Sequence, residues 1–359
     1  MTAEKARPRS KGRKVLKVIL IILLILAAFA AAVLITYTIA EYRPAARESM
    51  VPPQGNRTVS AGGSLSLVTY NVGYCGLGAA EDFFMDGGTH SFPDTKEAVE
   101  SYIEGNQKLM ADLSADLYLL QEVDLDSRRS YYTDQRASFE QALGMNSMYA
   151  CNYRCFWVPF PIPMLGKVEG GLVTLTNYNI DAVDRLALPE SFSWPIKTCN
   201  LKRCLLVSRM PVEGSSHELV IINLHLEAYD SGEGKIAQTK VLNEILEQEY
   251  AKGNYVIAGG DFNQTFEGIR TIPVQDESYW QPGKYALADL PEHYAFAVSD
   301  DDSTTRLDNK PYDAATQQEY IIDGFIVSDN ITVNSVNVVP TEYEYSDHRP
   351  VRLEITLND

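Results

Sequence analysis

The chain has 359 residues, 45% hydrophobic and 22% charged, which is the composition of a globular protein with a sizeable core. Its net charge of −17 is uneven: residues 1–17 carry seven basic side chains against one acidic one, and the remainder has 24 basic and 47 acidic residues, a net charge of −23. Such an acidic body repels polyanions, so a non-specific nucleic-acid-binding protein is disfavoured, although a local basic groove is still compatible with it.

An uncharged apolar segment, residues 18–40, follows this basic tail. It is dominated by Ile, Leu, Ala and Val, and its 23 residues suffice for one helix to cross a bilayer. Because residues 1–17 are basic, we expect a cytoplasmic N-terminus and an exported remainder at the cell membrane. The alternative is a cleaved signal peptide, but Val33-Leu34-Ile35 carries the apolar run beyond the small residues at 27–32. We therefore predict an uncleaved single-pass anchor.

The rest of the chain divides into a linker and one domain. Residues 41–63 contain three prolines and three glycines and are predicted to form a linker. Residues 64–359 are predicted to form a single catalytic domain, expected to be monomeric.

The five cysteines leave two alternatives open. Cys151 with Cys155, and Cys199 with Cys204, could form disulfides in an exported domain. Buried free thiols are the other interpretation.

Strand and helix patterns alternate along the domain. Apolar or alternating runs predict strands at residues 65–70, 117–120, 171–176, 203–207, 219–224, 255–258, 321–327 and 351–356. Helical spacing predicts a helix from Asp94, with Glu97 completing a capping box, and further helices over 136–143 and 236–250. The inner face of the last helix is expected to contain Ile236, Leu242, Ile245 and Leu246. This order is typical of an α/β sandwich with helices covering the sheets.

Polar side chains stand where many of these strands end. They are Asn71, Glu122, His225, Asp261 with Asn263, and Asp347 with His348. Gly259 and Gly260 permit a tight turn before Asp261, and Asp261 and Asn263 point to the same side of an extended chain. Asp323 lies within an otherwise apolar strand and needs a partner, for which His225 and His348 are both candidates.

Each of these residues has an ordinary structural role as well, but together they suit one metal–phosphate site. Glu122, Asp347 and Asn71 offer only oxygen ligands, which suits Mg²⁺ or Mn²⁺. Such a cation would polarise a phosphoryl oxygen, and Asp261 would orient or deprotonate the attacking water. A histidine held by Asp323 would stay protonated, and would hold the phosphate or protonate the leaving group.

Six segments of the chain, in order, resemble motifs of the endonuclease/exonuclease/phosphatase superfamily, which has the deoxyribonuclease-I-like fold. The segments are 69–71 (TYN), 120–123 (LQEV), 223–226 (NLHL), 260–263 (GDFN), 322–325 (IDGF) and 346–350 (SDHRP), and the resemblance spans residues 65–359. It implies a four-layer α/β sandwich, in which two packed mixed β-sheets are flanked by helices.

The resemblance also implies a role for each position. Glu122 is the main metal ligand, helped by Asn71 and Asp347. Asp261 aligns or activates water, and Asn263 steadies the phosphate. His348 pairs with Asp323 and contacts the scissile phosphate, while His225 is a second phosphate-side or proton-transfer group. The implied activity is hydrolysis of a phosphate ester.

Three functions remain open at this stage. Residues 170–172 and 224–226 resemble bacterial and neutral sphingomyelinases, and the apolar, aromatic residues 156–165 suggest contact with lipid, so a phospholipid head group is one substrate. In those enzymes a second histidine stands where this chain has Glu227-Ala228-Tyr229.

The second function is a nuclease on DNA or RNA, and the third is a catalytically silent binding module. A nuclease needs a basic groove, for which the candidates are Arg128, Arg129, Arg203 and Arg306. Arg306 is also expected to clamp phosphate in either enzyme.

Overall fold

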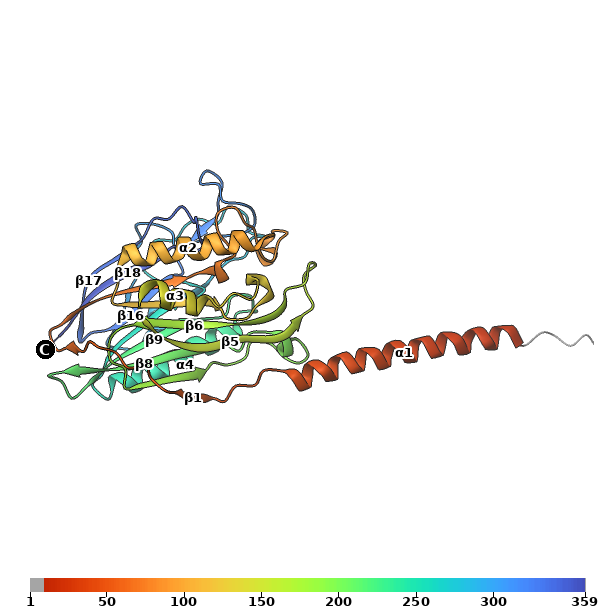
Figure 1. Ribbon diagram of the computed structural model, residues 1–359, viewed down its shortest axis with the longest axis horizontal. Coiled ribbons are helices and arrows are strands. Elements are labelled where there is room, and N and C mark those ends of the chain that lie inside the picture. Colours follow the sequence, from red (N-terminus) through yellow and green to blue (C-terminus); the bar gives the residue numbers. More distant parts are fainter. Residues whose placement is uncertain (1–9, 359) are drawn as a thin grey trace, which may run out of the picture.

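Two β-sheets stack face to face in the computed structural model, which describes residues 10–358, and helices cover their outer faces (Figure 1). The larger sheet has the order β1-β7-β8-β9-β10-β16-β13, with β2 paired to β8, and the smaller has the order β17-β18-β3-β4-β6-β5. Both are mixed, because β9–β10 and β3–β4 pair in parallel while most other neighbours are antiparallel. The predicted four-layer sandwich is confirmed.

The strands of the larger sheet are β1 (Arg47–Met50), β2 (Val59–Ser60), β7 (Ala182–Ala187), β8 (Cys204–Glu213), β9 (Glu218–His225), β10 (Tyr255–Asp261), β13 (Tyr294–Ala297) and β16 (Asp323–Ser328). Those of the smaller sheet are β3 (Ser64–Asn71), β4 (Leu117–Asp124), β5 (Asn146–Val158), β6 (Gly166–Thr176), β17 (Ile331–Val338) and β18 (Val351–Leu357). Two short pairs are β11 (Gln264–Phe266) with β12 (Gly283–Tyr285), and β14 (Thr305–Arg306) with β15 (Glu319–Tyr320). The helices are α1 (Ser10–Ala40), α2 (Lys96–Leu113), α3 (Gln135–Leu143) and α4 (Glu233–Tyr250), with 3₁₀ turns η1 (Gly73–Cys75), η2 (Phe84–Asp86), η3 (Arg128–Ser130), η4 (Ile196–Cys199) and η5 (Leu287–Asp289).

Alternation along the strands divides the core into layers. On β4, Leu119 points between the sheets, while Tyr118 and Leu120 point toward α2 and α3. On β10, Ile257 points between the sheets and Val256 packs toward α4. Residues two apart share a face of a strand. Alternate side chains of one strand therefore pack in the central layer between the sheets and in the layer under the helices.

A buried amide pair joins the two sheets across this apolar central layer. Gln121 of β4 donates from Nε2 to Oδ1 of Asn223 on β9 at 2.8 Å, and both side chains are fully buried. Asn223 in turn donates from Nδ2 to the carbonyl oxygens of Val173 (2.9 Å) and Leu120 (3.2 Å). Because hydrogen bonds are directional, they fix how the end of β4 faces the end of β9.

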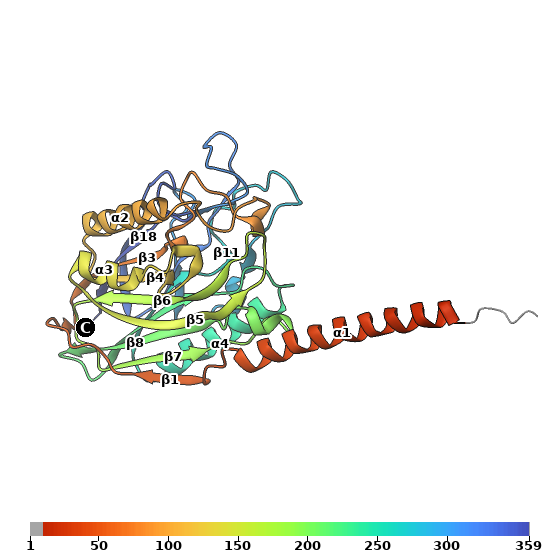
Figure 2. The same cartoon turned by 45° about the vertical axis from the view of Figure 1, so that its right-hand side comes forward.

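Helix α1 projects from the end of the sandwich where the β5–β6 turn also lies (Figures 1 and 2). Residues 12–40 of α1 are long and apolar enough to cross a membrane, and none of their most apolar stretch is buried in the protein. At its domain end, Tyr37 packs on Phe156 with ring centroids 4.9 Å apart, and Trp194 donates to Thr38 at 3.0 Å. Part of the predicted basic tail, residues 1–9, lies outside the described residues.

The predicted linker does not stand apart from the domain. Residues 47–50 form β1 and pair with β7, and residues 59–60 form β2 and pair with β8. The prolines and glycines therefore shape a segment that lies along the larger sheet, where strand pairing outweighs the flexibility that the composition suggests.

Several local predictions need correction. Helix α2 is capped by Thr95, whose hydroxyl accepts from the amide of Ala98, so the box proposed at Asp94 and Glu97 is not formed. Ile236 is 70% exposed, because α4 turns that position to solvent while Leu242 and Leu246 are buried. Strands β5 and β7 were not predicted, because polar residues interrupt the run of apolar residues in each of them.

The cysteines form no disulfide, and the two proposed pairs are not those in contact. All five thiols are free, and Cys155 of β5 contacts Cys199 of η4 instead. The hydrogen bond with Cys155 lowers the pKa of Cys199 to about 7.

Replacing Asn223 with Leu should destabilise the fold. The substitution keeps the volume but leaves the buried Gln121 amide and two carbonyl groups without this partner, at a cost of about 2–4 kcal/mol. We expect the Tm of the full chain in detergent micelles to fall by about 5–10 °C. The same change at exposed Asn334 should leave Tm nearly unchanged, and equal Tm values for the two variants would contradict the role of the amide pair.

Candidate active site

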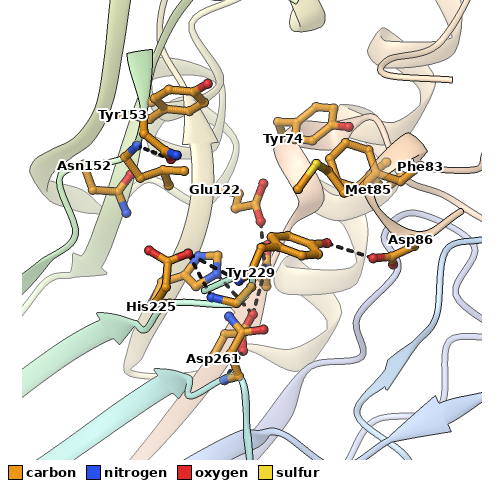
Figure 3. A pocket seen from close by; sticks show the side chains of 18 of the residues that line it. Tyr74, Phe83, Met85, Asp86, Glu122, Asn152, Tyr153, His225, Tyr229 and Asp261 are labelled. Carbon is orange, nitrogen blue, oxygen red and sulfur yellow. Dashed lines mark hydrogen bonds and ion pairs between the residues drawn. The ribbon is translucent and has the colours of Figure 1, made fainter. Parts of the chain in front are cut away.

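The ends of strands from both sheets meet beside a cavity of about 490 Å³ (Figure 3). Eight of the nine predicted site residues line it: Asn71, Glu122, His225, Asp261, Asn263, Arg306, Asp347 and His348. The ninth, Asp323, lies directly behind His348 and is 1% exposed. Residues separated by up to 277 positions are thus brought into one site, as the strand-end pattern predicted.

Two of these residues occupy a left-handed backbone conformation. Glu122 has φ +54° at a bulge of β4, where the register with β6 shifts between Leu120 and Val123. Asn263 has φ +51° in the turn after β10. Non-glycine residues rarely adopt this conformation, and a bulge re-aims a side chain out of the strand alternation. At Glu122 the bulge turns the side chain into the cavity that the other site residues line.

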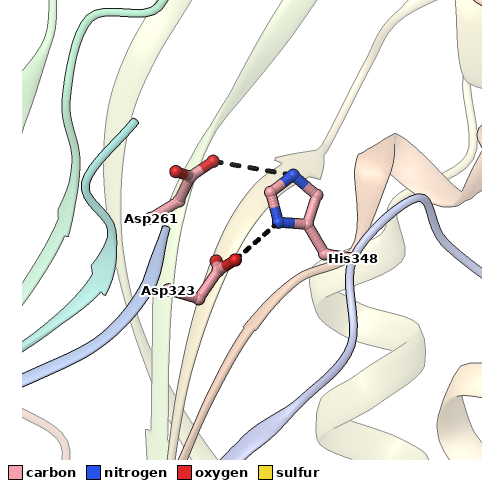
Figure 4. Close-up of side chains that lie close together, drawn as sticks. All are labelled: Asp261, Asp323 and His348. Carbon is pink, nitrogen blue, oxygen red and sulfur yellow. Dashed lines mark hydrogen bonds and ion pairs between the residues drawn. The ribbon is translucent and has the colours of Figure 1, made fainter. Parts of the chain in front are cut away.

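Asp323, His348 and Asp261 form a buried row (Figure 4). Asp323 Oδ2 lies 2.9 Å from His348 Nδ1, and His348 Nε2 lies 3.7 Å from Asp261 Oδ2. Burial alone would lower the pKa of His348, but the carboxylates of Asp323, Asp347 and Asp261 outweigh it and raise that pKa well above its ordinary value. Of the two partners left open for Asp323, the geometry therefore selects His348, which is cationic at neutral pH.

Asp261 is the carboxylate best placed to act on water. Burial and the nearby Asp323 raise the pKa of Asp261 to about 6, although His348 opposes the shift. Oδ1 accepts from the amide of Asn263 at 2.9 Å, and Oδ2 accepts from Asn71 at 3.1 Å. A carboxylate held in this way is ionised at neutral pH, and its raised pKa makes it a better base.

His225 differs from His348 in its charge. Its Nε2 lies 3.4 Å from Asp261 Oδ2, and its buried Nδ1 has no hydrogen-bond partner among the described residues. Burial, followed by the positive charges of Arg203 and His348, lowers the pKa of His225 well below its ordinary value. The site thus pairs a neutral and a cationic histidine.

Glu122, Asp347 and Asn71 form the oxygen-rich side of the site. Burial and repulsion from Glu122 raise the pKa of Asp347 to about 7, with His348 acting in the opposite direction. The side chain of Glu122 is 26% exposed, so it is open to the cavity. A divalent cation between Glu122 and Asp347 would relieve their repulsion, so the residues present fit a hard metal ion.

Asn71 does not present a ligand oxygen in this arrangement. Its Oδ1 accepts from the amide of Gly73 at 3.0 Å, and its Nδ2 faces Glu122 at 3.3 Å and Asp261 at 3.1 Å. The amide must turn over to bind a metal. As it stands, Asn71 links Glu122 on the smaller sheet to Asp261 on the larger one.

A second group of possible metal ligands is Asp261, Asp323 and His348, whose ligand atoms lie within 4.8 Å of one another. We assign this group to proton handling instead. A metal needs a histidine lone pair, whereas His348 keeps its proton and its Nδ1 is engaged by Asp323. Among the described residues, Glu122 and Asp347 are not engaged by a hydrogen-bonded partner of opposite charge, and a bound cation would favour the ionised form of Asp347.

Arg306, predicted to clamp phosphate, has a structural role. Its Nη1 lies 2.5 Å from Asp308 Oδ1, and both side chains are fully buried. The guanidinium also donates to four backbone carbonyls, those of Leu77, Gly78, Glu81 and Lys310. Its donors are used to hold the loop after η1, so Arg306 has little capacity left for substrate.

Several other cavity residues lie outside the motifs found in the sequence. Tyr229 donates to Asp86 at 2.8 Å and connects the loop after β9 to η2 (Figure 3). Arg129, on η3, is bound by both oxygens of Asp124 at 3.0 Å and lies 3.9 Å from Glu122. Two features of the sequence pointed to these residues. One is the basic pair Arg128-Arg129, and the other is the segment Glu227-Ala228-Tyr229, which stands where the sphingomyelinases have a second histidine.

Comparison with known proteins agrees with this geometry. The Endonuclease/Exonuclease/phosphatase family profile matches residues 68–348, most of the chain, which therefore belongs to this family of metal-dependent phosphoester hydrolases. No curated protein matches.

Solved structures share the fold at low identity. A Beutenbergia cavernae endonuclease/exonuclease/phosphatase aligns with TM-score 0.56 and 17% identity, covering 82% of this chain and 72% of that one. A Bacteroides vulgatus endonuclease/exonuclease/phosphatase aligns with TM-score 0.52 and 14% identity, covering 82% of this chain and 99% of that one. Truncated Caenorhabditis elegans TDP2 aligns with TM-score 0.51 and 16% identity, covering 82% of this chain and 99% of that one.

Replacing Asp323 with Asn should lower the pKa of His348. The change keeps the shape but removes the negative charge next to Nδ1, so the histidine should lose its proton at a lower pH. NMR pH titration of histidine-labelled, metal-free protein measures this shift. Asp329→Asn is a matched control, because it removes the carboxylate 2.9 Å from exposed His293 and should leave His348 unaffected. A His348 pKa unchanged in Asp323→Asn would refute the pairing.

Proposed function

We propose that this chain is a single-pass membrane enzyme whose extracytoplasmic domain hydrolyses phosphate esters of phospholipid head groups, with Mg²⁺ or Mn²⁺. The observation that carries the proposal is the composition of the cavity, which combines the polar strand-end residues with apolar side chains from η2, the β5–β6 turn and η4. Substrates with a phosphate next to an apolar body match such a cavity.

The proposed roles follow from the contacts at the polar end. Glu122 and Asp347, with Asn71 after its amide turns, would hold the cation, which supplies charge stabilisation to a phosphoryl oxygen. Asp261 orients the attacking water and takes its proton. His348, kept cationic by Asp323, faces the phosphate and is the proton donor available to the leaving group. Neutral His225 and Asn263 position the phosphate.

The apolar end of the cavity is built from segments near the anchor. Its lining comes from η2, the β5–β6 turn and η4, and includes Phe84, Met85, Val158, Phe160, Leu165, Phe192 and Ile196. These segments and their neighbours also expose large apolar side chains, some of which line the cavity as well, and we call this exposed set the apolar rim. The rim comprises Phe156, Trp157, Phe160, Ile162, Trp194 and Ile196.

The apolar rim surrounds the domain end of α1. Phe156 packs on Tyr37, the hydroxyl of Tyr37 donates to the carbonyl of Trp157 at 2.9 Å, and Trp194 donates to Thr38. If α1 crosses a bilayer, these side chains lie at its surface, where Trp and other apolar residues are favoured. The cavity then opens toward the leaflet that contains the lipid substrate.

A nuclease is less well supported, because the candidate basic groove is absent from the described residues. Arg129 is bound by Asp124, Arg306 by Asp308 and backbone carbonyls, and Arg128 by the carbonyl of Met164. Arg203 alone is left, and one cation does not follow a polyanionic backbone. A catalytically silent module is disfavoured because the oxygen-ligand residues, the base candidate Asp261 and both histidines all line one cavity.

Turnover by the full chain in phospholipid vesicles tests the proposal. The assay compares choline phospholipids including sphingomyelin, phosphoinositides, DNA and RNA after chelation and re-addition of Mg²⁺ or Mn²⁺. We expect metal-dependent lipid turnover that Glu122→Gln and Asp261→Asn each reduce by at least about 100-fold.

The alternative outcomes of this assay are distinct. Metal-dependent cleavage of DNA or RNA, lost in the same two variants, would replace the lipid proposal with the nuclease. No turnover of any substrate and no metal binding would support the binding module.

The apolar rim makes a separate prediction. Ile162 is 86% exposed in the β5–β6 turn and does not line the cavity. Ile162→Asp should reduce turnover of vesicle lipid about 10-fold, because burying Ile in lipid is worth about 2 kcal/mol and a buried carboxylate is unfavourable. Turnover of a short-chain phospholipid below its micellar concentration should not change. Leu287→Asp, on exposed η5, is the control, and an equal effect of both variants on vesicles would contradict the contact.

A further inference from the structure

Of the three buried arginines at the cavity, two donate several hydrogen bonds to the described part of the protein and one donates none there, although Nε of Arg306 is also unpartnered. Arg129 is held by Asp124, and Arg306 by Asp308 and four carbonyls. Arg203, which immediately precedes β8, is 5% exposed and lines the cavity. Its guanidinium makes no hydrogen bond within residues 10–358, and its Nε and Nη1 are buried without a partner.

The carboxylate nearest to Arg203 does not satisfy it. Glu227 Oε2 lies 3.9 Å from Arg203 Nε, beyond hydrogen-bonding distance. Glu227 is itself held by its own loop, because its Oε1 accepts from the amides of Ala228 (3.1 Å) and Tyr229 (3.4 Å). A buried guanidinium that makes no hydrogen bond is costly, and an anion that occupies its donors during the reaction would account for its retention.

The position of Arg203 indicates which anion that is. Arg203 acts on His225, since its charge contributes to the lowered pKa of that histidine, and His225 lies 3.4 Å from Asp261. An anion bound by Arg203 therefore sits beside the residues proposed to activate water. The rest of the cavity near Arg203 includes Cys199 and Leu201, on the side toward the apolar rim.

We propose that Arg203 binds anionic oxygens of the substrate phosphate and holds the phosphate in the cavity next to His225. This inference rests on the proposed phosphoester hydrolysis and adds a substrate-binding residue to it. The planar fork of a guanidinium matches two phosphate oxygens. Neutral His225 next to it does not compete for the anion, and its unpartnered Nδ1 is free to be either donor or acceptor.

The test uses inorganic phosphate as the probe, with the full chain in detergent micelles and Mg²⁺ present. Phosphate affinity is measured by calorimetry and by competitive inhibition of short-chain phospholipid turnover. Arg203→Met keeps the aliphatic stem and removes the charge, so phosphate binding and KM should both weaken on the order of 10- to 100-fold. Arg203→Lys should restore part of the affinity.

A stability measurement separates binding from a structural role. Because Arg203 makes no hydrogen bond to another described residue and its ion-pair contact is Glu227 at 3.9 Å, Arg203→Met should lower Tm by at most a few degrees, whereas removal of a hydrogen-bonded structural arginine lowers Tm more. Arg270→Met is the matched control: exposed Arg270 donates only to the carbonyl of Asp300, so phosphate affinity should stay at the wild-type value.

Each other outcome overturns the assignment. Phosphate affinity and KM unchanged in Arg203→Met, with wild-type turnover intact, would refute Arg203 as the phosphate ligand and leave the proposed function standing. Weakened binding with a strongly lowered Tm would make Arg203 structural. Absence of phosphate binding and of any phosphoester turnover in the wild type would refute both proposals.

Discussion

The site depends on one constraint, which is the fixed position of one sheet relative to the other. Apolar side chains between sheets pack well but permit sliding, because dispersion and hydrophobic contacts are not directional. The Gln121–Asn223 hydrogen bond is directional and fully buried, and it lies one residue before Glu122 and two before His225. A polar pair inside the central layer therefore costs desolvation energy and in return aligns the metal side of the site with the water-activating side.

A second link between the sheets is Asn71, which reaches from β3 to Asp261 on β10. Together with Asp323, His348 and His225 it encloses Asp261 in partners that differ in charge. One histidine is cationic because three carboxylates surround it, and the other is neutral because burial and three cations oppose its charge. The division of roles between two chemically identical side chains follows from their surroundings alone.

The sequence was sufficient for the sandwich and for the residues that meet at its end, because short motifs at strand ends are local and occur in a fixed order. It was insufficient wherever a residue's role depends on distant partners. Arg306 was mistaken for a phosphate clamp because the carbonyls that occupy it lie in residues 77–81. Arg203 was predicted only as one residue of a basic groove, since the absence of a hydrogen-bond partner among the described residues cannot be read from the chain. The bulge at Glu122 was also missed, because the apolar run ends at Leu120 although the strand continues to Asp124.

The junction between α1 and the domain has little slack. Glu41, the first residue after α1, is buried and paired with Lys202 at 2.8 Å, and β1 starts only six residues later, at Arg47. For the proposed enzyme, this junction prevents the domain from swivelling or reaching across to an apposed membrane. Enzyme and substrate would then meet by lateral diffusion within a single leaflet. The rate would follow the mole fraction of substrate in that leaflet rather than its bulk concentration, so dilution with inert lipid would slow turnover even at constant total substrate.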